Sequence, residues 1–246
     1  MELENRTVAI LGGPGLVGLA VARSIFEHRP SRIVLSALTR AEAERGVEEA
    51  ATDPAYDDSI QLIPAWGDIF LPDALRERTR DDVVADASAR AMLLDDLYGD
   101  LTDDVLRRSA LGSLLLEHKP EVVIDCVNTA TAFAYQNVFA SAQRLRELAR
   151  DGAADVEAVE KHLATLYLPQ LIRHVQIALE AMRRAGTRFY LKVGTAGTGG
   201  MGLNIPFTHS EERPSRVLLS KAGVAGAHTL LLYLMARTPD APAVKE

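Results

Sequence analysis

A glycine-rich turn near the N-terminus constrains the fold more than any other feature of the sequence. Residues 13–18, GPGLVG, match the spacing G-x-G-x-x-G, and Gly12, Gly15 and Gly18 also match G-x-x-G-x-x-G. A short apolar run, residues 7–11, precedes the turn, and apolar residues at helical spacing follow it. A strand, a glycine turn and a helix in this order begin a βαβ unit, which requires a parallel sheet with a right-handed crossover.

The same turn is a candidate binding site for a dinucleotide. One glycine lets the chain turn off the strand, one lets the backbone approach a pyrophosphate, and one lets the helix pack close to the strand. The N-terminus of the helix adds free N–H groups and the positive end of its dipole. A glycine-rich turn without a ligand is the alternative, and the position at the start of a βαβ unit favours the dinucleotide.

The rest of the chain continues the alternation of strands and helices. Further apolar strands are expected at residues 32–36, 60–66, 121–127 and 188–193. They predict a Rossmann-type, doubly wound parallel sheet in the order 3-2-1-4-5, with helices on both faces. Expected helices cover residues 16–29, 40–51, 103–118, 130–150, 156–185 with a kink at Pro169, and 215–236.

We expect residues 1–246 to form a single dinucleotide-binding domain. Nearly fifty residues separate the third and fourth strands, far more than a crossover needs, so a helical insertion is expected at about residues 76–104. Met92, Leu93, Leu94 and Leu97 are too few for an independent core, and the insertion should therefore pack as a cap. The chain stops where a sixth strand would begin, so a C-terminal substrate domain is expected to be absent or truncated.

Composition narrows the function classes. The 27 lysines and arginines and 34 acidic residues give a formal net charge of −7, which disfavours nucleic acid as a partner. A single cysteine and unpaired histidines argue against a disulfide framework or a metal site, and the aspartate pairs fit helix faces better than ion ligands. The sequence shows neither a signal peptide nor a continuous apolar span, so we expect no membrane association and a cytoplasmic protein.

The end of the second strand bears on the choice of cofactor. NAD sites of this type place an acid there for the ribose 2′-hydroxyl, but this chain has Ser36-Ala37-Leu38, with Arg40 close behind. The missing carboxylate removes repulsion from a 2′-phosphate, and an arginine can pair with one. We therefore favour NADP over NAD; the alternative for Arg40 is an exposed residue in the first turn of a helix.

Several short motifs resemble the short-chain dehydrogenase/reductase superfamily, nearest to its extended branch of NAD(P)-dependent epimerases and dehydratases. They are the glycine turn, residues 66–69 (WGDI), 118–125 (HKPEVVID), 128–130 (NTA), 183–194 (RRAGTRFYLKVG) and Ser220-Lys221. The resemblance implies that Asp68 contacts adenine, and that Asn128 and Thr129 lie beside the nicotinamide ribose. It also implies that Thr195 takes the place of the catalytic Ser/Thr, and that Lys221 binds ribose and supplies charge.

One departure from the family pattern leaves two functions open. The family tyrosine, four residues before the lysine, is Val217 here, and valine cannot transfer a proton. The first hypothesis is an oxidoreductase or epimerase/dehydratase acting on a small-molecule substrate such as a sugar nucleotide or similar polar alcohol. The second is a non-catalytic NAD(P)-binding sensor or scaffold of the NmrA-like kind.

Together these arguments predict a site and an assembly. The candidate catalytic residues are Thr195 and Lys221. The candidate cofactor-binding residues are Gly12, Gly13, Gly15, Leu16, Val17, Gly18, Ser36, Arg40, Asp68, Ile69, Asn128, Thr129 and Lys221. Residues 195–207, rich in glycine, are expected to form a mobile lid. Apolar helices after the fourth strand predict a homo-oligomer, on the surface where the family usually dimerises.

Overall fold

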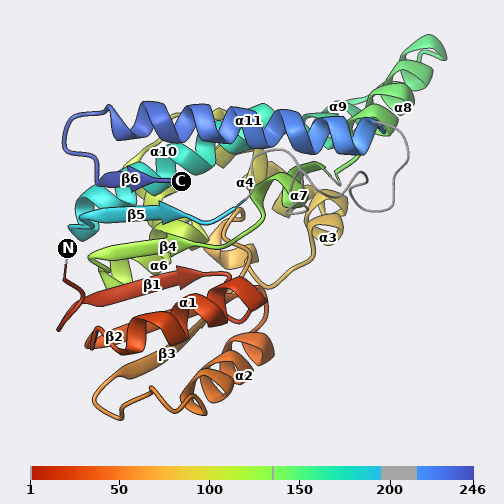
Figure 1. Ribbon diagram of the computed structural model, residues 1–246. Coiled ribbons are helices and arrows are strands. Elements are labelled where there is room, and N and C mark those ends of the chain that lie inside the picture. Colours follow the sequence, from red (N-terminus) through yellow and green to blue (C-terminus); the bar gives the residue numbers. More distant parts are fainter. Residues whose placement is uncertain (1, 135, 195–214) are drawn as a thin grey trace.

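The computed structural model (Figure 1) describes residues 2–134, 136–194 and 215–246. Its centre is a six-stranded sheet in the order β3-β2-β1-β4-β5-β6, with every neighbouring pair parallel. The strands are β1 (Thr7–Leu11), β2 (Arg32–Ala37), β3 (Gln61–Trp66), β4 (Val122–Asp125), β5 (Phe189–Lys192) and β6 (Ala243–Lys245). The predicted order is confirmed, and β6 extends it by one short edge strand.

Helices cover the sheet on two faces because side chains alternate along each strand. Ile10 and Ile124 face α1 (Leu16–Phe26) and α2 (Arg40–Ala51) in one core cluster. Leu11 and Val123 belong to the opposite cluster, with α6 (Ala110–His118), α10 (Tyr167–Ala185) and α11 (Arg216–Ala236). The helices α3, α4, α7, α8 and α9 gather at the right of Figure 1, beyond the carboxyl ends of the strands. Parallel α/β sheets bind their ligands at this end.

The insertion between β3 and β4 consists of short helices. It comprises η1 (Asp73–Leu75), α3 (Arg80–Ala85), α4 (Ala87–Tyr98) and α5 (Asp103–Arg108). Leu93 and Leu94 are buried in a cluster with Leu71, Val83 and Ala164, the last of these just after α9 (Val156–Leu163). The apolar side of α4 is therefore buried against other parts of the molecule.

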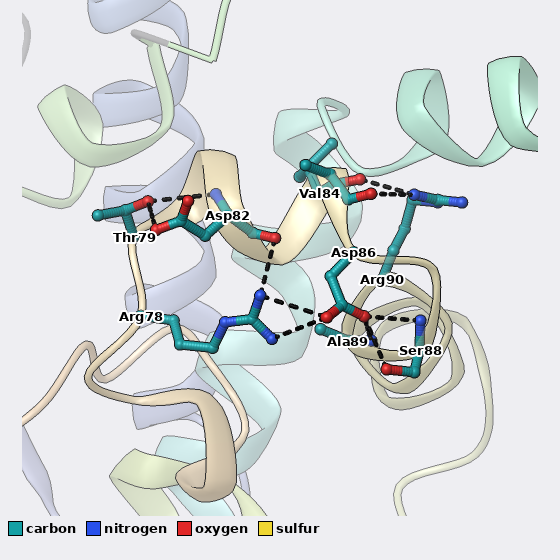
Figure 2. A network of polar contacts seen from close by, with 9 residues as sticks. Arg78, Thr79, Asp82, Val84, Asp86, Ser88, Ala89 and Arg90 are labelled. Atoms are coloured by element: carbon teal, nitrogen blue, oxygen red, sulfur yellow. Dashed lines mark hydrogen bonds and ion pairs between the residues drawn. The ribbon is translucent and has the colours of Figure 1, made fainter.

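Polar contacts fix the joint between α3 and α4 (Figure 2). The Asp86 carboxylate accepts hydrogen bonds from the backbone N–H groups of Ser88 and Ala89 and pairs with Arg78. These N–H bonds and the nearby arginine lower the pKa of Asp86 to about 2. Arg90, which is almost fully buried, donates to the Val84 carbonyl at 2.7 Å and pairs with Glu160 of α9 at 3.0 Å. The insertion is thus joined to α9 by an ion pair as well as by apolar packing.

Three predicted helices are each divided in the structure. The helix expected at 103–118 breaks at Ser109, whose hydroxyl accepts from the Gly112 N–H and caps α6. The helix expected at 130–150 becomes α7 (Thr129–Ala134) and α8 (Val138–Arg150), with Asn137 capping α8 at φ 47°. The helix expected at 156–185 becomes α9 and α10. Pro169 lies in the first turn of α10, where proline needs no N–H partner, so it does not kink the helix.

Among the described helices, α11 alone is long and apolar enough to cross a membrane, by length and composition. In the structure it packs against α7 and α10 and buries the side chains of Lys221 and His228. In this structure α11 is therefore one of the helices that cover the sheet.

Candidate functional site

The turn after β1 has the geometry that its glycines were expected to give. Gly12 has φ +72°, a conformation that favours glycine, and the Gly13 N–H donates to the Ser36 carbonyl of β2 at 2.9 Å. A Cβ on Gly18 would lie 2.3 Å from the Gly12 carbonyl oxygen, and one on Gly13 would lie 2.8 Å from the Leu35 side chain. No side chain fits at either position, so the first turn of α1 packs directly on the loop.

The N-terminus of α1 is open at this turn. Gly15 is its N-cap and no side chain caps it; no acid stands in its first turn, and Leu16 and Val17 are exposed. The first N–H groups of a helix lack intrahelical partners and carry the positive end of the dipole. They can bind a pyrophosphate without competition from a carboxylate.

A second glycine, on α2, supports the other side of the loop. A Cβ on Gly46 would lie 2.5 Å from Cγ of Pro14, so only glycine lets α2 approach the proline ring. α2 itself begins with a reciprocal capping box in which Thr39 and Glu42 bond each other's backbone N–H groups. The loop is thus held between β2 and α2.

A cleft of about 330 Å³ opens between the carboxyl ends of β1, β2 and β3 and helix α7. Four of the predicted cofactor residues line it: Gly12, Ser36, Asp68 and Ile69. The other lining residues are Ala37, Leu38, Gly67, Phe70, Arg80, Val127, Ala132, Phe133 and Gln136. None of these nine residues is among the cofactor-binding residues predicted from the sequence.

Asp68 is held in place at the floor of the cleft. Its carboxylate accepts from the Phe70 N–H at 2.9 Å, and its own N–H donates to the Arg76 carbonyl at 2.8 Å. Burial raises the pKa of Asp68, against the opposing effects of the Phe70 N–H and the Arg80 charge.

Arg40 is not among the residues that line the cleft. Its guanidinium stacks over Trp66, 4.7 Å from the ring centroid, and its Nε donates to Glu44 at 3.0 Å. Its side chain stays largely exposed. The stacking holds a positive charge beside the end of β2, where a 2′-phosphate would lie.

Asn128 and Thr129, after β4, differ in exposure. Asn128 is exposed, whereas Thr129 is buried with its hydroxyl 3.5 Å from Nζ of Lys192. Lys192 also donates to the Val127 carbonyl at 2.5 Å and pairs with Asp125 at 3.0 Å. The ammonium group thus fixes the turn that follows β4.

The Asp125–Lys192 pair is deeply buried, with exposed fractions of 1% and 6% for the two side chains. The Tyr190 hydroxyl donates to Asp125 at 2.8 Å, and the charge of Lys192 helps keep the pKa of Asp125 below its usual value despite burial. Burial lowers the pKa of His174 to about 3 and that of His228 to about 4, so both are neutral near pH 7. Nothing in the sequence indicates that this lysine and this aspartate, at the ends of two apolar strands, form an ion pair.

The remaining predicted residues cannot all be placed. Thr195 and the expected lid at 195–207 lie outside the described residues. Lys221 is buried on α11, and Val217, one turn earlier on the same helix, is partly exposed. The described residues contain no group of three or more metal-ligating side chains.

Solved structures with the same architecture can be identified, although no protein-family model and no curated protein matches the sequence. The chain is similar to a MalC reductase/Diels-Alderase from Malbranchea aurantiaca, with TM-score 0.50 and 12% identity, over 95% of this chain and 68% of that one. This likeness shows a shared fold, a parallel α/β sheet of the Rossmann type.

Two further structures belong to the same group of neighbours. RhlG of Pseudomonas aeruginosa, solved with NADP, has TM-score 0.40 and 15% identity over 96% of this chain and 66% of its own. A short-chain dehydrogenase/reductase from Mycobacterium ulcerans has TM-score 0.44 and 13% identity over 96% and 63%. The chain spans about two thirds of the length of these proteins.

Proposed function

We propose that the chain binds a nicotinamide dinucleotide, NADP in preference to NAD, along the cleft that begins at Gly12. The observation that carries this is the turn from Gly12 to Gly18, where backbone contacts leave no room for a Cβ and the N-terminus of α1 stays uncapped. Such a turn is suited to a pyrophosphate. Ser36 and Asp68 then line the place for the adenosine half.

The preference for NADP rests on charge at the end of β2. No acid stands at Ser36, Ala37 or Leu38, and the Arg40 guanidinium is held over Trp66 close by. A 2′-phosphate gains a cation there and meets no carboxylate from the strand. Glu44, which pairs with Arg40, is exposed and can give way to the phosphate.

We further propose that the protein is an oxidoreductase or epimerase/dehydratase that acts in the cytoplasm on a small polar alcohol such as a sugar nucleotide. The nicotinamide, when bound, supplies hydride chemistry. Lys221 supplies positive charge beside the ribose, and Thr195 is the candidate hydroxyl at the reacting carbon. Val217, where a tyrosine would transfer the proton, favours the second candidate, a dinucleotide-binding sensor without turnover.

Calorimetric titration with NADP and NAD tests the binding proposal. We expect NADP to bind at least tenfold more tightly, and Arg40→Ala to remove most of that difference while leaving NAD affinity nearly unchanged. Arg45→Ala, an exposed arginine on the same helix, is the matched control. Absence of binding by either cofactor at millimolar concentration would overturn the proposal, and tighter binding of NAD would overturn the role of Arg40.

Turnover is tested separately with the cofactor-loaded protein. Hydride transfer to or from a polar alcohol, lost in Lys221→Met but not in Val217→Ala, supports the enzyme. If NADP binds and no alcohol, ketone or sugar nucleotide changes the nicotinamide absorbance or is itself converted, the sensor is the function.

A further inference from the structure

A second pocket adjoins the cleft, on the side of the insertion. It shares Ile69, Phe70, Arg80 and Phe133 with the cleft, and its remaining walls come from α4, α5 and α10 and from Leu71, Pro72 and Ser109. The open space measures about 40 Å³, several times what a single water needs. Nothing in the proposed binding of a dinucleotide accounts for this pocket.

Arg173 of α10 lines the pocket with hydrogen-bonding capacity left over. Its side chain is 9% exposed, and its Nη2 donates to the carbonyls of Gly99 and Leu97 at the end of α4. Its Nε and Nη1 are sealed from solvent and have no acceptor among the described residues. Buried guanidinium N–H groups without acceptors are costly, so a bound acceptor would stabilise this arrangement.

Arg80 of α3 also lines the pocket and also has a buried N–H group without an acceptor in the part of the chain that the structure describes. Its Nη2 donates to the side chain of Gln170 and, at 3.4 Å, to the carbonyl of Ala164. Its Nε, also buried, has no acceptor among the described residues. Two guanidinium groups from different elements therefore line one pocket, and each has at least one buried N–H group without an acceptor among the described residues.

The acids nearby are already engaged. Asp96 pairs with Arg108, and Asp68 accepts from the Phe70 N–H. Asp100, near Arg173, is exposed, where water and salt screen its charge. Because Asp68 and Asp96 offset part of the charge of Arg80 and Arg173, the N–H groups without acceptors among the described residues, rather than net charge, favour a ligand that accepts hydrogen bonds.

We infer that this pocket binds a small monocarboxylate with a short apolar tail. The carboxylate is the acceptor that the N–H groups of Arg173 and Arg80 lack. The apolar walls, which would make a doubly charged phosphate costly to desolvate, suit the tail. These walls are formed by Leu71, Leu93, Leu97, Val105, Phe133 and Ile177.

Calorimetry and thermal unfolding with propionate, measured without any nicotinamide, test the inference. Propionate should bind at least about tenfold more tightly than propionamide, its neutral isostere, and should raise Tm. Arg173→Met should abolish the difference. Arg146→Met, which removes an exposed charge on α8, should not.

Arg173 also holds the end of α4, so a second variant guards against loss of folding. Val105→Phe narrows the pocket and leaves both arginines in place, and it should weaken propionate binding at least about tenfold. Nitrogen-15 NMR should show the Nε–H signals of Arg173 and Arg80 shift with propionate. Equal binding of propionate and propionamide, or binding that both variants leave unchanged, would overturn the inference. Because no cofactor is present, neither result depends on dinucleotide binding.

Discussion

Gly18 packs so closely against the backbone of Gly12 and Gly13 that an added methyl group would change the conformation of the turn. In Gly18→Ala the new Cβ would be forced against the Gly12 carbonyl, 2.3 Å away, so the backbone of the loop must move. We expect the free energy of unfolding to fall by about 1–3 kcal/mol and dinucleotide affinity to fall with it. Urea denaturation and calorimetry measure the two effects.

Gly223 and Gly226 provide the control, because both are exposed in α11 and a Cβ at either would meet nothing within 4 Å. Alanine there should stabilise the protein by up to about 1 kcal/mol, since glycine is a poor helix former. Equal effects at Gly18 and at these sites would contradict the packing argument for the turn.

The buried pair of Asp125 and Lys192 predicts strong coupling between two substitutions. Lys192→Met leaves the Asp125 carboxylate buried with only uncharged donors, and Asp125→Asn leaves the ammonium in the same position. Each should cost about 3–5 kcal/mol, and the double variant should cost clearly less than the sum. A double-mutant cycle by urea denaturation checks this, and additive costs would mean that the pair does not interact.

Two buried histidines predict a dependence of stability on pH. The pKa of His174 is lowered to about 3 and that of His228 to about 4, against about 6.5 in the unfolded chain. Between pH 6.5 and 4 the unfolded state therefore binds more protons, so stability is full above pH 6.5 and falls as pH drops. Each histidine should contribute a slope of up to about 1.4 kcal/mol per pH unit.

Urea unfolding midpoints measured at several pH values show which histidine causes the pH dependence of stability. His174→Gln and His228→Gln should each flatten the curve over this window. His28→Gln, at an exposed histidine on the sheet's amino end, should leave it unchanged. A curve that keeps its slope in both buried variants would contradict the assignment.

Some site residues could be predicted from the sequence, whereas contacts between residues far apart in the sequence could not. The glycines could be predicted because their spacing after a strand is local, and Asp68 was predicted from the family resemblance of residues 66–69. The pairing of Asp125 with Lys192 could not, because the two residues are 67 positions apart in sequence and meet only through the parallel register of β4 and β5. The place of Arg80 in the cleft could not be predicted for a similar reason, because it depends on how the insertion packs against α10.

At the level of helices and strands, the insertion between β3 and β4 behaves as part of the main body. Leu93 of α4 is nearly fully buried in the cluster with Leu71 and Ala164, whereas Met92 beside it is exposed. Leu93→Ala should lower the free energy of unfolding by about 2–5 kcal/mol, in one cooperative transition.

Met92→Ala should change stability by about 0.5 kcal/mol or less, as surface substitutions do. Chemical denaturation followed by both Trp66 fluorescence and circular dichroism gives the comparison. Separate transitions for the two signals would indicate that the insertion unfolds on its own.

The strands and their order could be predicted, because short apolar runs between turn residues have few other interpretations. Helix breaks were harder to predict. Ser109 ends α5 and caps α6, and Asn137 caps α8; apolar spacing alone does not distinguish such a break from a continuous helix. Pro169 was expected to bend a helix, but the chain instead begins α10 just before it.

For the whole molecule, exposed apolar side chains point to assembly, which stays a prediction. On α11 these are Leu219, Leu230, Tyr233 and Leu234, and α8 buries no side chain although its sequence is amphipathic. We expect a homo-oligomer in light scattering at micromolar concentration. Leu230→Glu combined with Leu234→Glu should shift it toward monomer, because burying a charge at an apolar interface is costly.

The exposed pair Arg144→Ala and Glu147→Ala, on the polar part of α8, provides the control and should leave the molar mass unchanged. A monomer for the unmodified chain over the whole concentration range would contradict the prediction.

The contact between Pro14 and Gly46 should limit which residues can occupy these two positions in related sequences. The proline ring occupies the space that a side chain at position 46 would need, so the glycine turn and the middle of α2 are not free to diverge separately. Among related chains, a larger residue at position 46 should occur only with a smaller residue at position 14. Two positions 32 residues apart should then change together over evolutionary time, as a record of how closely α2 lies against the loop.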